Sequence, residues 1–322
     1  MVIHIFNVIK PGLLTTVQDL GRKGYQKYGL SVSGAVDYYA HRIANILVGN
    51  QDNAATLEVT MIGPTLKVLE TRKIAITGAD LTPYVNNSPV PLWRSFTVSE
   101  GDILSFQGYR SGCRAYIAVA GGLDVEETLG SKSTDLISEI GGHHGRRLIK
   151  GDTITANAVH TNKICLSRRL STELIPTYTK HVRVRIILGP QDDAFTAKGI
   201  ETFLSSEYTV TKDSNRMGCR LEGPTIEHKN GADILSEGMF MGAIQVPQNG
   251  QPILFLSGRP SVGGYTKIGG VITVDLPKVA QLKPNDRVSI EKVTLDEAHE
   301  LLYKQENIFK LLQASIGEGG GL

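Results

Sequence analysis

Residues 11 to 37 hold a dense group of side chains that could bind or activate a small polar molecule. The sequence is PGLLTTVQDLGRKGYQKYGLSVSGAVD. Gly12, Gly21, Gly24 and Gly34 mark places where the backbone takes positive φ or approaches other groups closely. The hydrogen-bonding side chains between them are Gln18, Asp19, Arg22, Tyr25, Gln26, Ser33 and Asp37.

Long ordered loops with this composition more often present a binding surface than link two elements, and this stretch shows little helix or strand periodicity. We therefore predict that it is a binding loop and that Asp19 and Arg22 are catalytic, with Gln18 and Ser33 binding substrate. The alternative is that Asp19 pairs with Arg22 and that the remaining side chains cap neighbouring strands.

A second group of candidate residues lies in the C-terminal half. Residues 215–218, NRMG, form a predicted turn with an exposed Arg216 guanidinium, suited to bidentate contact with a carboxylate or phosphate. The loop 257–267, SGRPSVGGYTK, follows the apolar run PILFL and suits a small anionic or amide substrate. The alternative is a surface hairpin with solvated charges. The candidates for this site are Arg216, Tyr265 and Lys267 as catalytic residues, and Arg220, Arg259, Ser261, Gly263 and Gly264 as substrate-binding residues.

Other kinds of site find little support in the sequence. His143 and His144 are adjacent and lack Cys or carboxylate ligands at metal spacing, so we predict no metal site. LGSKST at 129–134 does not match a P-loop, although its backbone N–H groups and Lys132 could hold an anion. A GxSxG elbow and a reactive-cysteine signature are both missing from the sequence.

Composition places the chain among soluble globular proteins. The 322 residues are 41% hydrophobic and include 35 glycines, which allows two domains and favours turns over long helices. A net charge of +2 argues against nucleic-acid binding. Cys113, Cys165 and Cys219 are odd in number and far apart, which favours a reducing compartment. Without a signal peptide or a long apolar run, we expect a cytoplasmic protein that does not contact a membrane.

The periodicity of the sequence predicts the elements that position these residues. Residues 2–9 read as a strand, and Asp37 reads as the N-cap of a helix that stops at Gly49. From residue 56 to 120, short runs with period two predict antiparallel strands. A capping box at Thr294 and Glu297 starts an amphipathic C-terminal helix.

Turns and repeats suggest two related β-rich halves. The segments 100–103, 150–153 and 284–287 are similar tight turns that each lead into an alternating strand. Gly-Pro-Thr occurs at 63–65 and again at 223–225, once in each half. We place the boundary in the mixed segment 158–180, which gives domains at 1–170 and 171–322.

The motifs in this order resemble the allophanate hydrolase subunit 2 family, also called the biotin-dependent carboxyltransferase or KipA/PxpC family. The resemblance begins with PGLLTTVQDLGR, GYQ and SGAVD. It continues through LEVTMIGPTLKV (57–68), RAYIAVAGGLDV (114–125), LGSKST (129–134), GGHHGR (141–146), RMGCRLEGP (216–224) and GGYTKI (263–268). It implies a mainly β fold of two tandem cyclophilin-like β-barrels with a few short helices and a C-terminal helix.

The same resemblance implies a subunit of an ATP-dependent 5-oxoprolinase, an amidohydrolase that opens 5-oxo-L-proline to L-glutamate. Its partners would be a homologous KipI-like (PxpB-like) B subunit and a PxpA-like A subunit of the LamB/YcsF family, with ATP used by the assembled complex. Two alternatives stay open. One is a KipA-type regulatory protein that binds a KipI-like kinase inhibitor, and the other is a biotin-dependent carboxyltransferase component.

The loop 257–267 departs from the family's Asp-x-Gln-Thr/Pro-Thr-Gly-Gly-Tyr pattern. The chain keeps Gly263, Gly264, Tyr265 and Lys267, but Gly258 replaces the acid and Pro260 replaces the glutamine. Val262 replaces the second hydroxyl residue. That carboxylate and amide are therefore missing from this loop. Two interpretations stay open: the chain is an altered or inactive relative, or it relies on Asp19 and a partner subunit.

Overall fold

The computed structural model describes residues 2–159 and 167–317, which form two compact units. Unit 1 comprises Met1–Lys23, Ser33–Tyr178 and Asn307–Leu322, and unit 2 comprises Gly24–Val32 and Thr179–Glu306. The domain boundary at residues 170 and 171 stays a prediction. Cys165 lies outside the described residues, whereas Cys113 and Cys219 are both buried.

Unit 1 consists of two antiparallel sheets that share a core. The first has the order β11-β1-β4-β9-β6-β7 and the second the order β2-β3-β10-β5-β8. Alternating apolar residues such as Phe6 and Val8 of β1 meet Leu57 and Ile117 of the second sheet in a fully buried cluster. The strands are β1 Val2–Lys10, β2 Leu14–Gln18, β3 Thr56–Thr60, β4 Thr65–Val68, β5 Arg72–Asp80, β6 Pro83–Val85, β7 Ser88–Pro89, β8 Arg94–Val98, β9 Ile103–Phe106, β10 Ser111–Val119 and β11 Thr153–Asn157.

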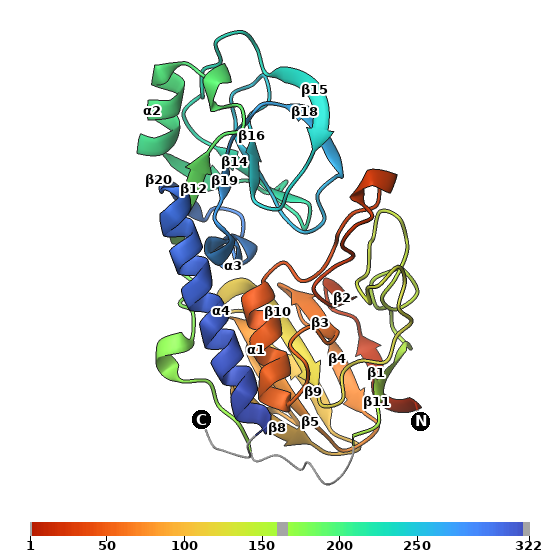
Figure 1. The fold of residues 1–322 in the computed structure, drawn as a ribbon. Helices are drawn as coiled ribbons and strands as arrows, with labels where there is room; N and C mark the ends of the chain where they lie inside the picture. Colours follow the sequence, from red (N-terminus) through yellow and green to blue (C-terminus); the bar gives the residue numbers. More distant parts are fainter. Residues whose placement is uncertain (1, 160–166, 318–322) are drawn as a thin grey trace. The chain divides into compact units, whose positions relative to one another are not determined.

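Helix α1 (Tyr38–Val48) covers the outer face of the second sheet, as Figure 1 shows. Asp37 is its N-cap, as predicted, because Oδ1 accepts a hydrogen bond from the Ala40 N–H at 2.8 Å. The helix ends at Gly49, whose φ of 84° is readily adopted by glycine. Its apolar side chains pack on Ala75 and Ala118 of the sheet.

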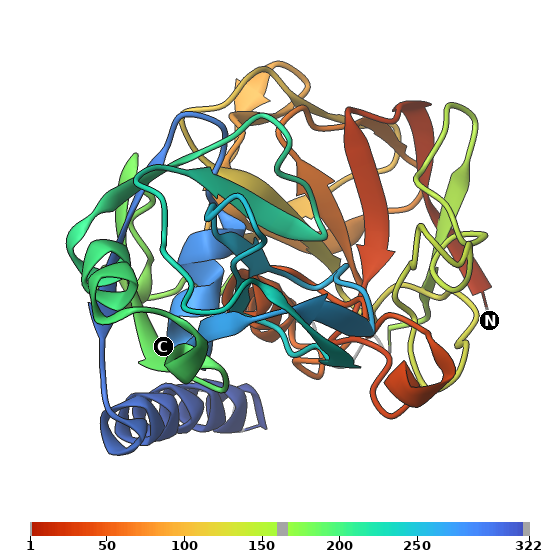
Figure 2. The same ribbon diagram turned by 90° about the horizontal axis from the view of Figure 1, so that it is seen from above.

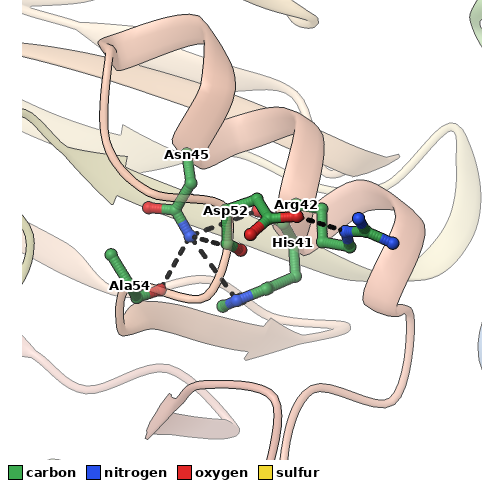
Figure 3. Close-up of polar contacts among 5 residues, drawn as sticks. All are labelled: His41, Arg42, Asn45, Asp52 and Ala54. Atoms are coloured by element: carbon green, nitrogen blue, oxygen red, sulfur yellow. Dashed lines mark hydrogen bonds and ion pairs between the residues drawn. The ribbon is translucent and has the colours of Figure 1, made fainter. Parts of the chain in front are cut away.

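A polar contact group fastens the last turns of α1 to the loop before β3 (Figure 3). Asn45 Nδ2 donates to the Ala54 carbonyl at 2.7 Å, and Arg42 Nε lies 2.7 Å from Asp52 Oδ2. His41 is fully buried beside this group, and its Nδ1 lies 3.0 Å from Thr56 Oγ1. A hydrogen bond and an ion pair from side chains of α1 therefore hold the loop between Gly49 and β3 to the helix, in addition to apolar packing.

Unit 2 is a closed barrel with the strand order β12-β19-β16-β17-β14-β13-β20. All its neighbouring strands pair antiparallel except β12 and β20, which run parallel. A separate two-stranded ribbon pairs β15 with β18. The strands are β12 His181–Leu188, β13 Glu207–Val210, β14 Gly218–Glu222, β15 Asp233–Gly238, β16 Ala243–Gln245, β17 Ile253–Phe255, β18 Val262–Tyr265, β19 Lys267–Val271 and β20 Arg287–Lys292.

Short helices complete unit 2. Helix α2 (Ala197–Ser205) lies on the outside of the barrel in Figures 1 and 2, and α3 (Leu276–Ala280) follows β19. Unit 2 also has 3-10 turns at Gln26–Tyr28, Asp192–Ala194 and Thr273–Asp275. A further 3-10 turn, Thr172–Leu174, lies in unit 1.

The C-terminal helix α4 (Leu295–Gly317) begins at the predicted capping box. The Thr294 N–H donates to Glu297 Oε2 at 2.8 Å, and the Glu297 N–H donates to Thr294 Oγ1 at 3.3 Å. Its last part belongs to unit 1, where Phe309 is fully buried. The phenyl ring of Phe309 packs on Tyr39, and the Arg42 guanidinium lies 3.6 Å from the ring centroid.

The mainly β fold with a few short helices and a C-terminal helix is confirmed. The three similar turns take positive φ at Gly101 (90°), Gly151 (92°) and Asn285 (73°). One expectation was wrong, because the opening stretch contains the strand β2, which pairs with β3. Four of the five residues of β2 are buried in succession, so both of its faces are covered and its sequence does not alternate.

Candidate functional site

The carboxylate of Asp19 accepts hydrogen bonds from a neighbouring loop of unit 1 and from its own stretch of chain. Its Oδ1 accepts from the hydroxyls of Ser131 at 2.7 Å and Ser133 at 2.5 Å, and from the Gly21 N–H at 2.7 Å. Its Oδ2 accepts from the Lys132 N–H at 2.6 Å. The loop around Lys132 thus holds an anion through backbone and hydroxyl groups, and that anion is an internal carboxylate.

The guanidinium of Arg22 is fully buried beside the same loop. Nε donates to the Thr128 carbonyl at 2.9 Å and Nη2 to the Ser133 carbonyl at 3.0 Å, while Nη1 finds no partner in the described chain. Burial lowers the pKa of Arg22, and the carboxylates of Asp135 and Asp19 oppose that shift. Within residues 2–159 and 167–317, Asp19 and Arg22 form no ion pair with each other; each contacts the loop instead.

Gln18 and Ser33 converge on the Thr134 carbonyl. Gln18 Nε2 donates to it at 3.2 Å and Ser33 Oγ donates to it at 2.6 Å, and both side chains are buried. Gln18 Oε1 is a buried acceptor with no partner among the residues that the structure describes. Four predicted site residues of unit 1, Gln18, Asp19, Arg22 and Ser33, therefore surround one loop, residues 128–135.

A cavity of about 500 Å³ lies beside Arg22 in unit 1. Thr128 and Gly141 line this cavity, and a Cβ atom at Gly141 would lie 2.6 Å from Arg22 Nη2. Gly141 has a φ of 69°, so both space and backbone conformation require glycine there. His143 also lines the cavity, and burial lowers the pKa of its imidazole although Asp152 opposes the shift. A small polar molecule could enter next to the loop that holds Arg22.

The adjacent histidines of this cavity contact each other, and His143 also contacts Asp152. In the described parts of the chain, no three His, Cys, Asp or Glu side chains are grouped as metal ligands. His143 and His144 stack at an angle, with ring centroids 4.4 Å apart. His143 Nε2 lies 3.5 Å from Asp152 Oδ1, which accounts for the orientation of that imidazole.

In unit 2 the predicted catalytic Lys267 is buried, with 1% of its surface exposed. Its Nζ lies 2.5 Å from Glu237 Oε1, and Gln191 Nε2 donates to the same oxygen at 2.8 Å. The hydrogen bond from Lys267 is the main cause that lowers the pKa of Glu237, which keeps the carboxylate ionised. Lys267 is therefore a buried ammonium with one carboxylate partner, and the interpretation of its charge as solvated was wrong.

The ribbon of β15 and β18 presents Tyr265 next to Lys267. Tyr265 is 40% exposed, and its carbonyl accepts a hydrogen bond from Gln245 Nε2 at 3.0 Å. Gly263 lies in the same strand, where a Cβ atom would approach Gln245 Nε2 to 2.6 Å and Met239 Sδ to 2.8 Å. A side chain at position 263 would therefore collide with Gln245 and Met239, so glycine is needed there. The exposed Tyr265 and the buried Lys267 lie two residues apart in the chain.

The remaining predicted residues of unit 2 differ in exposure. Arg259 is buried, with 6% of its surface exposed, so the solvated interpretation was wrong for this residue also. Arg216 is half-buried, where we expected an exposed guanidinium. Arg220 is exposed, and the Ser261 carbonyl accepts the Met239 N–H at 3.0 Å.

The middle of the opening stretch, Gly24–Val32, belongs to unit 2. Gln26 Nε2 donates to the Met239 carbonyl at 2.9 Å, and Ser31 Oγ donates to the Ser257 carbonyl at 3.3 Å. This segment therefore lies against the loop that carries Arg259. From the sequence we also predict that the opening stretch and the loop with Gly263 and Gly264 face one cleft, and this stays a prediction.

Sequence reasoning missed several partners of the candidate residues. Glu237 and Gln191, which hold Lys267, lie 30 and 76 residues from it along the chain. The signal for the Asp19 contacts was present in the two serines of LGSKST, which flank Lys132 and donate to Asp19. From the sequence, that segment suggested a site for an external anion rather than for a carboxylate of the chain itself.

The family profile of the carboxyltransferase domain, subdomain A and B, matches residues 28–292. The chain belongs to this carboxyltransferase family. It is 34% identical over 310 residues to the C subunit of the Escherichia coli 5-oxoprolinase, covering 96% of this chain and 97% of the relative. It is 35% identical over 303 residues to the C subunit of the Haemophilus influenzae 5-oxoprolinase, covering 94% and 96%.

A solved structure has a similar fold. The crystal structure of the Kluyveromyces lactis urea carboxylase superposes with a TM-score of 0.89 at 31% identity. The match covers 96% of this chain but 29% of the urea carboxylase chain.

In the described residues no helix is long and apolar enough to span a bilayer.

Proposed function

We propose that this chain is the C-type subunit of an ATP-dependent 5-oxoprolinase. The complex would convert 5-oxo-L-proline, ATP and water to L-glutamate, ADP and phosphate. The observation that supports this most strongly is 34–35% identity over nearly the full length of two 5-oxoprolinase C subunits. The reaction is proposed for the cytoplasm, where ATP is available.

The chemistry requires activation of a poor electrophile. In the proposed sequence, transfer of the γ-phosphoryl group to the ring amide oxygen releases ADP and makes the carbonyl carbon electrophilic. Water adds to that carbon and the C–N bond breaks as the nitrogen takes up a proton, which leaves an acyl phosphate. A second water molecule hydrolyses the acyl phosphate to the carboxylate and releases phosphate. Negative charge develops on oxygen during these steps, so fixed cationic donors accelerate them.

The cationic candidates are suited to that task in different ways. Lys267 Nζ uses one of its three donors on Glu237, and Arg22 Nη1 has no partner in the described chain. We assign charge stabilisation to Lys267, Arg22 and Arg216, with Tyr265 as a further donor. Asp19 is assigned a positioning role, because hydroxyl and backbone donors surround its carboxylate. The substrate-binding residues in this proposal are Gln18, Ser33, Arg220, Arg259, Ser261, Gly263 and Gly264.

Partners are part of the proposal. Both bacterial relatives are named as one lettered subunit of 5-oxoprolinase, which indicates an enzyme of several subunits. We propose a KipI-like (PxpB-like) B subunit and a PxpA-like A subunit, with ATP consumed by the assembly.

The test is ATP hydrolysis by the chain reconstituted with its A-type and B-type subunits. The proposal expects hydrolysis that depends on 5-oxo-L-proline and falls at least about tenfold after Lys267→Ala or Arg22→Ala. Unchanged activity in both variants, or no dependence on 5-oxo-L-proline, contradicts it. Arg183→Ala is the matched control, because this arginine is 74% exposed.

A second candidate function is carboxyl transfer in a biotin-dependent system. The superposition with the urea carboxylase favours it. The chain itself has no Met-Lys biotin-carrier motif, so carboxybiotin would arrive on a separate carrier. Decarboxylation of free carboxybiotin by this chain, with no ATP hydrolysis in the mixture with 5-oxo-L-proline, would favour this alternative.

A further inference from the structure

Arg259 has a buried guanidinium that is largely unused by the protein. Nε donates to the Met239 carbonyl at 3.1 Å. Nη1 is buried and has no hydrogen-bond partner among the described residues, so both of its N–H bonds lack an acceptor. Buried donors are nearly always paired, so an unpaired one calls for an explanation.

The positive charge of Arg259 is also uncompensated. Burial lowers its pKa to about 10, and no carboxylate in the described chain acts in the opposite direction. The guanidinium is still protonated near pH 7. Other cations of unit 2 have acids: the buried Lys267 contacts Glu237 at 2.5 Å, and the half-buried Arg185 contacts the fully buried Asp275 at 2.7 Å. Arg259 therefore differs from them in lacking an anion.

The segments around Arg259 contain no acid to supply that anion. The chain on either side of it, residues 254–267, reads LFLSGRPSVGGYTK, and the adjoining segment 24–32 reads GYQKYGLSV. Gln26 Nε2 donates to the same Met239 carbonyl as Arg259 Nε, and Ser31 contacts Ser257 two residues before the arginine. The nearby β15 carries Glu237, but Lys267 and Gln191 already donate to it.

We infer that Arg259 binds the carboxylate of a small organic acid. The unused end of a guanidinium presents parallel N–H bonds that match the two oxygens of a carboxylate. Binding would supply both the missing acceptor and the missing counter-charge. This inference rests on the proposed function for the identity of the acid, which is then 5-oxo-L-proline, a cyclic amide with one carboxylate.

The inference is tested by calorimetric titration of the full chain with four ligands. These are 5-oxo-L-proline, acetate, inorganic phosphate and pyrrolidin-2-one, which is the same ring without its carboxylate. Wild type is expected to bind 5-oxo-L-proline and, more weakly, acetate. Arg259→Met is expected to weaken 5-oxo-L-proline binding at least about tenfold, and Arg259→Lys less, because it keeps the charge without the fork. The exposed Arg183 gives the control variant Arg183→Met, which is expected to bind as wild type does.

Three outcomes overturn the inference. They are equal binding by wild type and Arg259→Met, no binding of either carboxylate to wild type, and binding of phosphate in preference to both carboxylates. A cooperative unfolding transition checks that each variant is folded. The proposed function fails separately: carboxylate binding that depends on Arg259, without ATP hydrolysis in the reconstituted complex, supports the anion site and contradicts the 5-oxoprolinase.

Discussion

Both carboxylate oxygens of Asp19 accept hydrogen bonds from other groups of the chain. Two hydroxyls and two backbone N–H groups donate to its carboxylate, which joins the opening stretch to the 128–135 loop. Removing the carboxylate leaves these donors without their acceptor, and unsatisfied donors are costly where water does not reach them. We propose that these contacts let Asp19 position Gln18 and Arg22, which lie one and three residues from it in the chain.

The prediction at the residue scale concerns this carboxylate. Asp19→Ala is expected to lower the free energy of unfolding by about 2–4 kcal/mol, because several charge-assisted hydrogen bonds are lost together. Urea unfolding followed by circular dichroism measures it. The exposed Asp213 provides the control, and Asp213→Ala is expected to change stability by less than about 0.5 kcal/mol. Equal stability of the two variants would contradict the positioning role.

The buried His41 of helix α1 makes the stability of the chain depend on pH. Burial lowers its pKa to about 4, and the nearby carboxylates of Asp19, Glu58 and Asp52 only partly oppose this. The unfolded chain, with a histidine pKa near 6.5, therefore binds a proton between about pH 6.5 and 4 that the folded chain does not. Stability from the neutral imidazole is present above this window and is lost as the pH falls through it.

We expect the free energy of unfolding to fall by about 2–3 kcal/mol more in wild type than in His41→Gln between about pH 7 and pH 4.5. Urea unfolding at the two pH values measures the difference. His299→Gln, at an exposed position, should show the wild-type pH dependence. A variant His41→Gln with the same pH dependence as wild type would show that the buried imidazole does not titrate as described.

At the element scale, the end of α4 is fastened to unit 1 by one aromatic side chain. Phe309 is fully buried against Tyr39 and below the Arg42 guanidinium, whereas Leu311 on the same helix is 72% exposed. Phe309→Ala should destabilise the chain by about 3–5 kcal/mol, since a large buried side chain is lost and a cavity is left. Leu311→Ala should cost less than about 0.5 kcal/mol, and thermal unfolding of both variants makes the comparison. Similar melting temperatures would mean that α4 does not pack here.

The sequence predicted correctly the helix ends whose hydrogen bonds are made by residues close together in the chain. Asp37, Gly49 and the pair Thr294 and Glu297 are helix ends whose hydrogen bonds lie within a few residues. Strand β2 was missed because both of its faces are buried, so the period-two pattern is absent. Strand β18, VGGY, pairs only with β15 in a two-stranded ribbon and has little side-chain pattern.

The candidate site shows the same division between local and long-range information. Residue type and loop composition selected Asp19, Arg22, Arg259 and Lys267. Their burial depends on contacts over long separations, such as Asp19 with Ser131 and Lys267 with Glu237, which lie 112 and 30 residues apart. No local pattern encodes such pairs, so their chemical state could not be predicted from the sequence.

At the scale of the whole molecule, the opening stretch contributes to both units. Residues up to Lys23 and from Ser33 lie in unit 1, and Gly24–Val32 lies in unit 2. Candidate charges therefore occur in each unit: Arg22 in unit 1, and Lys267 and Arg259 in unit 2. The proposed reaction depends on both groups, together with the ATP-consuming partners.

The most direct test measures glutamate and ADP formed from 5-oxo-L-proline and ATP by the A-type, B-type and present subunits together. We predict that glutamate and ADP appear in equal amounts and that both disappear when this chain is omitted. Glutamate formation at the same rate without this chain, or a stable complex that forms neither product, would contradict the assignment of this chain as a working 5-oxoprolinase subunit.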